Sequence, residues 1–352
     1  MMVMRINLAL TSHRLGSPNS SVNDFYVGTT ASGQERFEVI SNTSKQLYAN
    51  GNGFFIIGMH RSGTSVLAGA LSTLGYSTGT GKLIGASDFN PKGYFEMESL
   101  VIQNQDWLTE QEVLWGPGIG DFNESFAYLN SNGTETLRSI EVPQPWMMKD
   151  PRLCLTLPAW DSYFEKPPPA VFTYRHPLTV ALSLCQRSKT ELFYGLRSWV
   201  YHNMHAIKNF PKDRCVVRTS HQALMQHPVQ ETLRISDEMT LRCGLAEAPS
   251  RSDAHAPSRI EQFVSKSLHH NQEVIEKGVD MDRLRVMFKH CSFPRTKNNH
   301  RGNRNMYNLA MSVYADIESG RAFEEGYVWP NLPYMNGEIL AYKMKVWNGT
   351  LS

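Results

Sequence analysis

Twelve consecutive residues decide the fold of this chain: Phe54-Phe55-Ile56-Ile57-Gly58-Met59-His60-Arg61-Ser62-Gly63-Thr64-Ser65. The apolar start predicts a buried β-strand, and the two glycines predict a tight turn. Apolar residues then recur at helical spacing as far as Leu74, and Gly75 marks the end of a helix. A strand, a short loop and a helix N-terminus gather free backbone N–H groups around one small volume, and the helix dipole adds to their attraction for an anion. The stretch therefore predicts a phosphate-binding loop.

The loop differs at one position from the phosphate-binding loop of ATPases. That loop has the pattern G-x-x-x-x-G-K-[ST], in which the lysine reaches the outer phosphates. Gly58 and Gly63 keep the spacing, but Thr64 stands in place of the lysine, and the cation has moved into the loop as Arg61. This arrangement resembles the 5′-phosphosulfate loop of the sulfotransferases, which transfer a sulfuryl group from 3′-phosphoadenosine 5′-phosphosulfate (PAPS). The resemblance implies that the 5′ end of PAPS is bound by Arg61, Ser62, Gly63, Thr64 and Ser65. A glycine turn beside an exposed arginine is the plainer alternative.

A second motif follows the predicted strand 170–174. Arg175 ends that strand, and Pro177 suits the first turn of a following helix. Ser183 lies eight residues after Arg175, two turns into the helix. Sulfotransferases grip the 3′-phosphate of PAPS with an Arg–Ser pair at this spacing, so the resemblance assigns that role to Arg175 and Ser183. A planar arginine fork and a short hydroxyl both suit a phosphate, although an arginine at a strand end can also be a solvated charge.

A third predicted strand, 146–149, ends in Lys149, and Asp150 and Arg152 follow it. Open α/β sheets bind their ligands at the carboxyl ends of the strands. Sulfotransferases often have a lysine at this strand end, where it contacts the bridging oxygen and the transferred sulfuryl group. The resemblance therefore makes Lys149 a catalytic residue alongside Arg61. A surface cluster of salt bridges is the alternative.

The general base that takes the acceptor proton is harder to place. Sulfotransferases use a His or a Glu, depending on the branch of the family. The segment 90–96 resembles one found in the Glu-using and related microbial branches, which favours Glu96 as the base. The His-using branch has a Lys-x-His pair at the Lys149 strand, but here Pro151 occupies the place of the His. Rival bases are Glu98, Asp150 and His60, and Glu96 could equally be a charge in the first turn of a helix.

A basic stretch late in the chain gives a fourth signal. Residues 283–304 hold seven Lys or Arg and no acid. Sulfotransferases commonly close a basic, glycine-containing loop over the 3′-phosphate, and the resemblance assigns this role to Arg301 and Gly302. A charge run is more often a solvated face, so both interpretations stay open.

Composition excludes several classes of protein. A hydrophobic content of 41% indicates a globular chain, and a net charge of +2 does not suggest a nucleic-acid partner. No apolar run is long enough to span a bilayer, and the N-terminal residues resemble a signal peptide only poorly. Five widely spaced cysteines argue against a zinc site or a dense disulfide framework, so all of them could be reduced. These features slightly favour a soluble cytoplasmic protein. The Asn-x-Ser/Thr sequons could be glycosylated only if the chain entered a secretory lumen. They lie at Asn19, Asn42, Asn123, Asn132 and Asn348.

The chain divides on its pattern into a flexible extension (1–52), one sulfotransferase-like domain (53–320) and a C-terminal tail (321–352). The extension is rich in Ser, Thr, Asn and Gly, and a surface loop is predicted at 246–257. Strands are predicted at 53–58, 146–149, 170–174 and 214–218. Helices are predicted at 64–75, 97–114, 177–188, 191–208, 258–276 and 305–319. This alternation is typical of an α/β fold with a parallel, P-loop-like sheet flanked by helices.

The combined motifs predict a PAPS-dependent enzyme that transfers a sulfuryl group in line to a hydroxyl or amine of a carbohydrate or small molecule. No metal is expected, because no pair of carboxylates has metal-ligand spacing. Two other classes stay open: a P-loop kinase or NTPase, and a non-catalytic nucleotide- or carbohydrate-binding relative. The acceptor and the oligomeric state do not follow from the sequence.

Overall fold

The computed structural model describes residues 25–29, 35–39, 52–87, 90, 92–188, 190–264 and 297–333. The chain forms two compact units, residues 1–47 and 48–352. The first unit contains strands β1 (Phe25–Thr29) and β2 (Glu35–Val39), which pair antiparallel with Phe25 opposite Val39. The sequence analysis predicted no strand in this part of the chain.

The second unit is built on a parallel sheet of four strands in the order β4-β3-β5-β6. The strands are β3 (Gly53–Ile57), β4 (Trp146–Lys149), β5 (Ala170–Tyr174) and β6 (Val216–Ser220). The central strand β3 pairs with β4 on one side, where Ile56 is opposite Lys149, and with β5 on the other, where Ile56 is opposite Val171. The predicted α/β class and the parallel sheet are confirmed, and β6 begins two residues later than the predicted strand 214–218.

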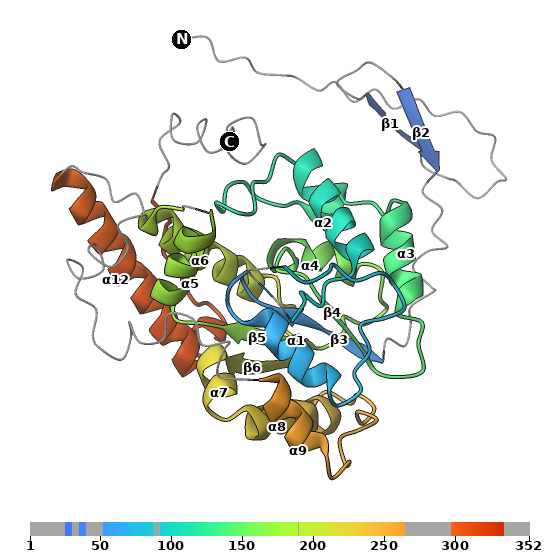
Figure 1. Cartoon of the computed structure of the whole chain (residues 1–352). Helices are drawn as coiled ribbons and strands as arrows, with labels where there is room; N and C mark the ends of the chain where they lie inside the picture. The colour runs from blue at the N-terminus through green and yellow to red at the C-terminus, as the bar shows by residue number, and fades with distance from the viewer. Residues whose placement is uncertain are drawn as a thin grey trace. The chain divides into compact units, whose positions relative to one another are not determined.

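Helices cover both faces of this sheet (Figure 1). Alternate residues of β3 point to opposite faces: Phe54 and Ile56 belong to one core cluster with residues of α1, α8 and α9, whereas Phe55 and Ile57 belong to another with residues of α2, α4, α5 and α6. Burial on both faces explains why β3 is apolar throughout. The described helices are α1 (Thr64–Ser72), α2 (Glu98–Glu110), α3 (Ser131–Ser139), α4 (Leu153–Asp161), α5 (Pro177–Ser188), α6 (Leu192–Lys208), α7 (His221–Gln226), α8 (Pro228–Leu241), α9 (Ala256–Phe263) and α12 (Lys297–Ser319), with short 3₁₀ turns η2 (Glu124–Phe126) and η4 (Arg321–Phe323).

Two expectations about the later part of the chain need correction. Arg301 and Gly302 were expected in a loop, but both lie within helix α12. The apolar stripe of α12 begins at Met306, which is buried, and the helix extends back from it through the basic residues. The helix expected at 258–276 is described as α9 as far as Phe263, and the rest of that range lies outside the described residues.

The expectation of reduced cysteines is wrong. Cys215 precedes β6 and Cys243 follows α8, and the two form a disulfide with their Cα atoms 5.5 Å apart. Cys185 on α5 is also disulfide-bonded. The free cysteine of the described residues is Cys154, which is buried in the core. Sequence spacing could not show the first pairing, because it depends on α8 packing against the edge strand β6.

Across the ranges that the structure describes, no helix is both long enough and apolar enough to cross a membrane.

Candidate functional site

The predicted phosphate-binding loop connects the carboxyl end of β3 to the first turn of α1. Gly58 is required by close approach, since a Cβ atom there would lie 2.4 Å from the carbonyl oxygen of Thr173 on β5. Arg61 and Gly63 both have positive φ angles, 67° and 89°, which turn the chain into the helix. The first N–H groups of a helix have no partner within it, so those of α1 remain available to a ligand. The hydroxyl of Ser62 is buried and has no hydrogen-bond partner.

Arg61 joins two of the motifs that the sequence analysis treated separately. Its Nε donates a hydrogen bond of 2.7 Å to Oγ of Ser183 on α5. Nη1 of Arg175, at the end of β5, donates a hydrogen bond of 3.2 Å to the backbone oxygen of Arg61. The structure thus brings together the residues predicted for the 5′ and 3′ sides of the nucleotide, and Arg61 and Ser183 meet across 122 residues of sequence.

Burial, and after it a neighbouring like charge, disfavour the cationic forms of Arg61 and Arg175. Burial, and after it the charge of Arg187, lower the pKa of Arg61. Burial, and after it the charge of Arg61, lower the pKa of Arg175 to about 10. Because burial and like charge both oppose the cationic form, a bound anion would relieve the cost of holding these guanidinium groups together. The electrostatics therefore suit a strongly anionic ligand.

A pocket opens beside Arg175 and is lined by residues of several further elements. His176 follows β5, Ser220 ends β6, His221 begins α7, and Tyr314 belongs to α12. Burial and the neighbouring Arg175 lower the pKa of His176 to about 4. The sequence analysis missed His221 and Tyr314, whose elements reach the pocket only through the tertiary fold.

Lys149 lies under the loop, at the carboxyl end of β4. Its Nζ is 2.5 Å from Oε1 of Glu96 and 3.2 Å from Oγ of Ser65, in the first turn of α1. The side chains of Lys149 and Glu96 are 1% and 10% exposed. Burial raises the pKa of Glu96, and the charge of Lys149 opposes that rise. The predicted leaving-group cation and the predicted base therefore form one buried ion pair against the loop.

Two of the rival candidates for the general base, Glu98 and Asp150, do not contact Lys149 or the loop in the way that Glu96 does. Glu98 begins α2 and pairs with Lys82, with side chains 43% and 79% exposed. Asp150 is fully buried, and its carboxylate accepts hydrogen bonds from Nδ2 of Asn104 and from both the backbone N–H and the guanidinium of Arg152. These contacts give Asp150 a structural task in fixing the end of β4.

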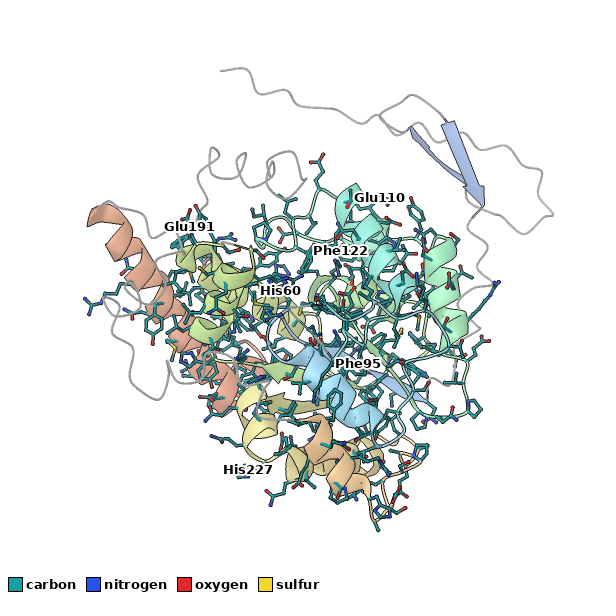
Figure 2. All side chains as sticks on the ribbon, in the orientation of Figure 1. His60, Phe95, Glu110, Phe122, Glu191 and His227 are labelled. Atoms are coloured by element: carbon teal, nitrogen blue, oxygen red, sulfur yellow. A yellow bond between two sulfur atoms is a disulfide. The ribbon has the colours of Figure 1, made fainter. Side chains whose placement is uncertain are left out.

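His60, the third rival, packs within the loop region of the larger unit (Figure 2). Its ring lies 5.0 Å from that of Trp115 and 5.4 Å from that of His202 on α6, measured between centroids. Burial, and next His202, lower its pKa well below the ordinary value, so the ring is neutral near pH 7. Its Nε2 atom is buried without a hydrogen-bond partner. The sequence analysis missed His202, which carries no local motif.

Among the ranges given above, no group of three or more His, Cys, Asp or Glu side chains could hold a metal ion. The Arg301 side chain and the surroundings of Gly302 lie outside the description, so the contribution of these two residues to the site remains a prediction.

Comparisons with known proteins add little to this geometry. No family model matches the chain. No curated protein matches it either. Among solved structures, it is similar to the sulfotransferase domain of the olefin synthase from Synechococcus PCC 7002, with 14% identity, a TM-score of 0.37, and coverage of 77% of this chain and 97% of that one. A likeness at this level carries no functional conclusion, which has to come from the site itself.

Proposed function

We propose that this chain is a sulfotransferase that uses PAPS to sulfate a hydroxyl or amine of a carbohydrate or small molecule. The observation that carries the proposal is the contact of Arg61 with Ser183 and Arg175, which unites the loop with the Arg–Ser motif. A nucleotide with phosphate groups on both sides of its ribose needs cationic donors at two places that lie close together. The pKa values of Arg61 and Arg175, both lowered chiefly by burial, and the unpartnered hydroxyl of Ser62 suit such an anion.

In the proposed enzyme, some residues of the site bind the phosphates of PAPS and others compensate the charge that develops during transfer. PAPS supplies an activated sulfuryl group. The backbone N–H groups of Gly63, Thr64 and Ser65 and the hydroxyls of Thr64 and Ser65 would hold its 5′-phosphate, as helix N-termini hold anions. Arg175 and Ser183 would hold its 3′-phosphate.

The chemical step is an in-line displacement. A bond forms between the acceptor atom and sulfur, the bond from sulfur to the bridging oxygen breaks, and that oxygen keeps the electron pair. Sulfuryl transfer resembles phosphoryl transfer in its loose transition state, in which charge builds on the leaving oxygen. Lys149 and Arg61 would compensate this charge, and Glu96 would take the acceptor proton. Glu96 is favoured over His60 as the base because it contacts Lys149, whereas His60 packs between Trp115 and His202.

Two features of the site disfavour the kinase alternative. Thr64 stands in place of the lysine of an ATPase loop. A kinase of this type also holds Mg²⁺ with an aspartate near a strand end, but the carboxylate of Asp150 is already engaged by Asn104 and Arg152. We therefore expect activity to survive EDTA. Complete loss on chelation that Mg²⁺ restores would favour a kinase.

The 3′-phosphate offers the sharpest test of the proposed function. Hydrogen bonds to charged groups contribute about 1.5–3 kcal/mol each. Two or three of them should favour adenosine 3′,5′-bisphosphate over AMP by roughly two to four powers of ten in Kd, after desolvation costs. Isothermal titration measures both affinities. Arg175→Ala should remove most of the preference and leave AMP binding nearly unchanged, because the loop at 61–65 still holds the 5′ side.

The matched control is Arg138→Ala, an exposed arginine on α3, which should keep the full preference. Equal affinity of the wild-type protein for AMP and the bisphosphate would refute the assignment. Tight bisphosphate binding without turnover of labelled PAPS, across a broad acceptor library, would instead identify a non-catalytic relative.

A further inference from the structure

The oxidation state of the cysteines bears on where this protein folds. Cys215 and Cys243 form a disulfide, and Cys185 is disulfide-bonded as well. The reducing cytosol keeps thiols free, so structural disulfides are typical of secreted proteins and of the lumen of the secretory pathway. The reduced cysteines expected from the sequence were one of the features that favoured the cytoplasm, and these disulfides contradict that expectation.

In a glycosylating lumen the Asn-x-Ser/Thr sequons become candidate modification sites. Two of the five fall among residues whose side chains the structure describes, Asn123 and Asn132. The other three lie outside those residues. The two described sequons differ sharply in their surroundings.

Asn123 lies in an exposed segment that connects α2 to η2, and residues 123–126 are all exposed. Its backbone N–H donates a hydrogen bond of 2.7 Å to Oε1 of Gln111, which holds the segment against the end of α2. Its side-chain oxygen accepts a 3.0 Å hydrogen bond from the N–H of Ser125, the hydroxyl residue of the same sequon. The neighbouring Phe126 is 69% exposed, so a large polar adduct at Asn123 displaces no packed side chain.

Asn132 is half-buried in the first turn of α3 and has no comparable room. The middle residue of its sequon, Gly133, is buried so tightly that a Cβ atom there would lie 2.3 Å from Gln103 Oε1. The hydroxyl of Thr134 is engaged by the carbonyl oxygen of Asn130 at 3.2 Å. A glycan at Asn132 would have to fit beside this packed turn.

We propose that the protein matures in an oxidising secretory lumen and that Asn123 is an N-glycosylation site. The proposal is independent of sulfuryl transfer, because neither Asn123 nor the Cys215–Cys243 disulfide belongs to the nucleotide site. It joins two separate observations, the disulfide and the exposed sequon, which both fit the same compartment.

The first experiment uses the protein purified from the cells that naturally produce it. Enzymatic removal of N-glycans in ¹⁸O-water, followed by peptide mass spectrometry, should label position 123. Alkylation of the unfolded, unreduced protein should modify Cys154 and leave Cys215 and Cys243 unmodified. An unglycosylated Asn123, or free thiols at both Cys215 and Cys243, would overturn the proposal.

The second experiment assigns the glycan to this sequon. The full chain, directed through the secretory pathway of a eukaryotic host, should lose one glycan on Ser125→Ala, which keeps Asn123 and its turn. Ser125→Thr preserves the sequon and should keep the glycan. Asn132→Gln is the control and should leave the glycan at position 123 in place. Identical glycan mass for wild type and Ser125→Ala would refute the site.

Discussion

Lys149 and Glu96 form a buried ion pair with 2.5 Å between Nζ and Oε1, and the same Nζ contacts Ser65 Oγ at 3.2 Å. The pair links the carboxyl end of β4 to the first turn of α1, where the proposed 5′-phosphate site begins. Removing one partner of such a pair leaves an uncompensated buried charge, which typically costs about 3–5 kcal/mol. Effects on stability and on catalysis therefore have to be measured separately at these two positions.

Lys149→Ala should lower turnover by a factor on the order of 10²–10³, as the loss of one preorganised transition-state donor does. The affinity for adenosine 3′,5′-bisphosphate should change much less, because Arg61 and Arg175 remain. Single-turnover kinetics with PAPS and isothermal titration with the bisphosphate separate the two quantities. Equal losses in turnover and affinity would place Lys149 in ground-state binding.

Glu96→Gln should reduce turnover by about 10²–10⁴, the usual contribution of a general base, because the amide cannot accept the acceptor proton. Glu98→Gln is a matched control two residues away. Its partner Lys82 is exposed, and exposed pairs contribute about 0–1 kcal/mol, so turnover should be unchanged. If Glu96→Gln keeps normal turnover while His60→Gln loses it, the base is His60.

The sequence predicted the parts of the site that lie within one strand and its following turn. Lys149 ends β4, Arg175 directly follows β5, and Arg61 lies in the loop after β3. Parallel strands present their carboxyl ends at one edge, so the convergence of these residues follows from the fold class. The site residues contributed by helices, and their contacts, could not be predicted from the strand ends. His202 and His221 reach the loop only after α6 and α7 have packed, and the pairing of Glu96 with Lys149 depends on the entry into α2.

The buried histidines predict acid instability. The pKa of His202 is lowered to about 4, chiefly by burial. In the unfolded chain, the imidazole of His202 has its ordinary pKa near 6.5 and binds a proton as the pH falls below that value. In the native state, the same imidazole stays neutral until the pH approaches 4, so the unfolded state binds more protons between these two values. Stability is fully present above pH 6.5 and is lost as the pH falls towards 4.

Urea unfolding should therefore show a loss of about 2 kcal/mol from His202 alone between pH 7 and pH 5. His202→Asn preserves a donor for the carbonyl oxygen of Ser198, which His202 Nδ1 approaches to 2.7 Å, and should flatten this dependence. His227→Asn alters an exposed histidine and should leave the slope as it is. An unchanged slope in His202→Asn would show that another group dominates acid unfolding.

The loop geometry can be tested at Gly63, where an added methyl group has two separable effects: it strains the backbone, and it displaces His221. Gly63 has φ 89°, and a Cβ atom there would lie 2.4 Å from Cδ2 of His221. Gly244 has φ 75° and nothing within 4 Å of the same position. A left-handed backbone costs a non-glycine residue about 1–2 kcal/mol, so both alanine variants should lose about that much stability.

Only Gly63→Ala should also push His221 away from the loop and move the first N–H groups of α1. We therefore expect it to weaken binding of adenosine 3′,5′-bisphosphate at least tenfold, whereas Gly244→Ala binds normally. Urea unfolding and isothermal titration on both variants separate strain from site geometry. Normal bisphosphate binding by a folded Gly63→Ala protein would mean that the loop between β3 and α1 is not the phosphate site.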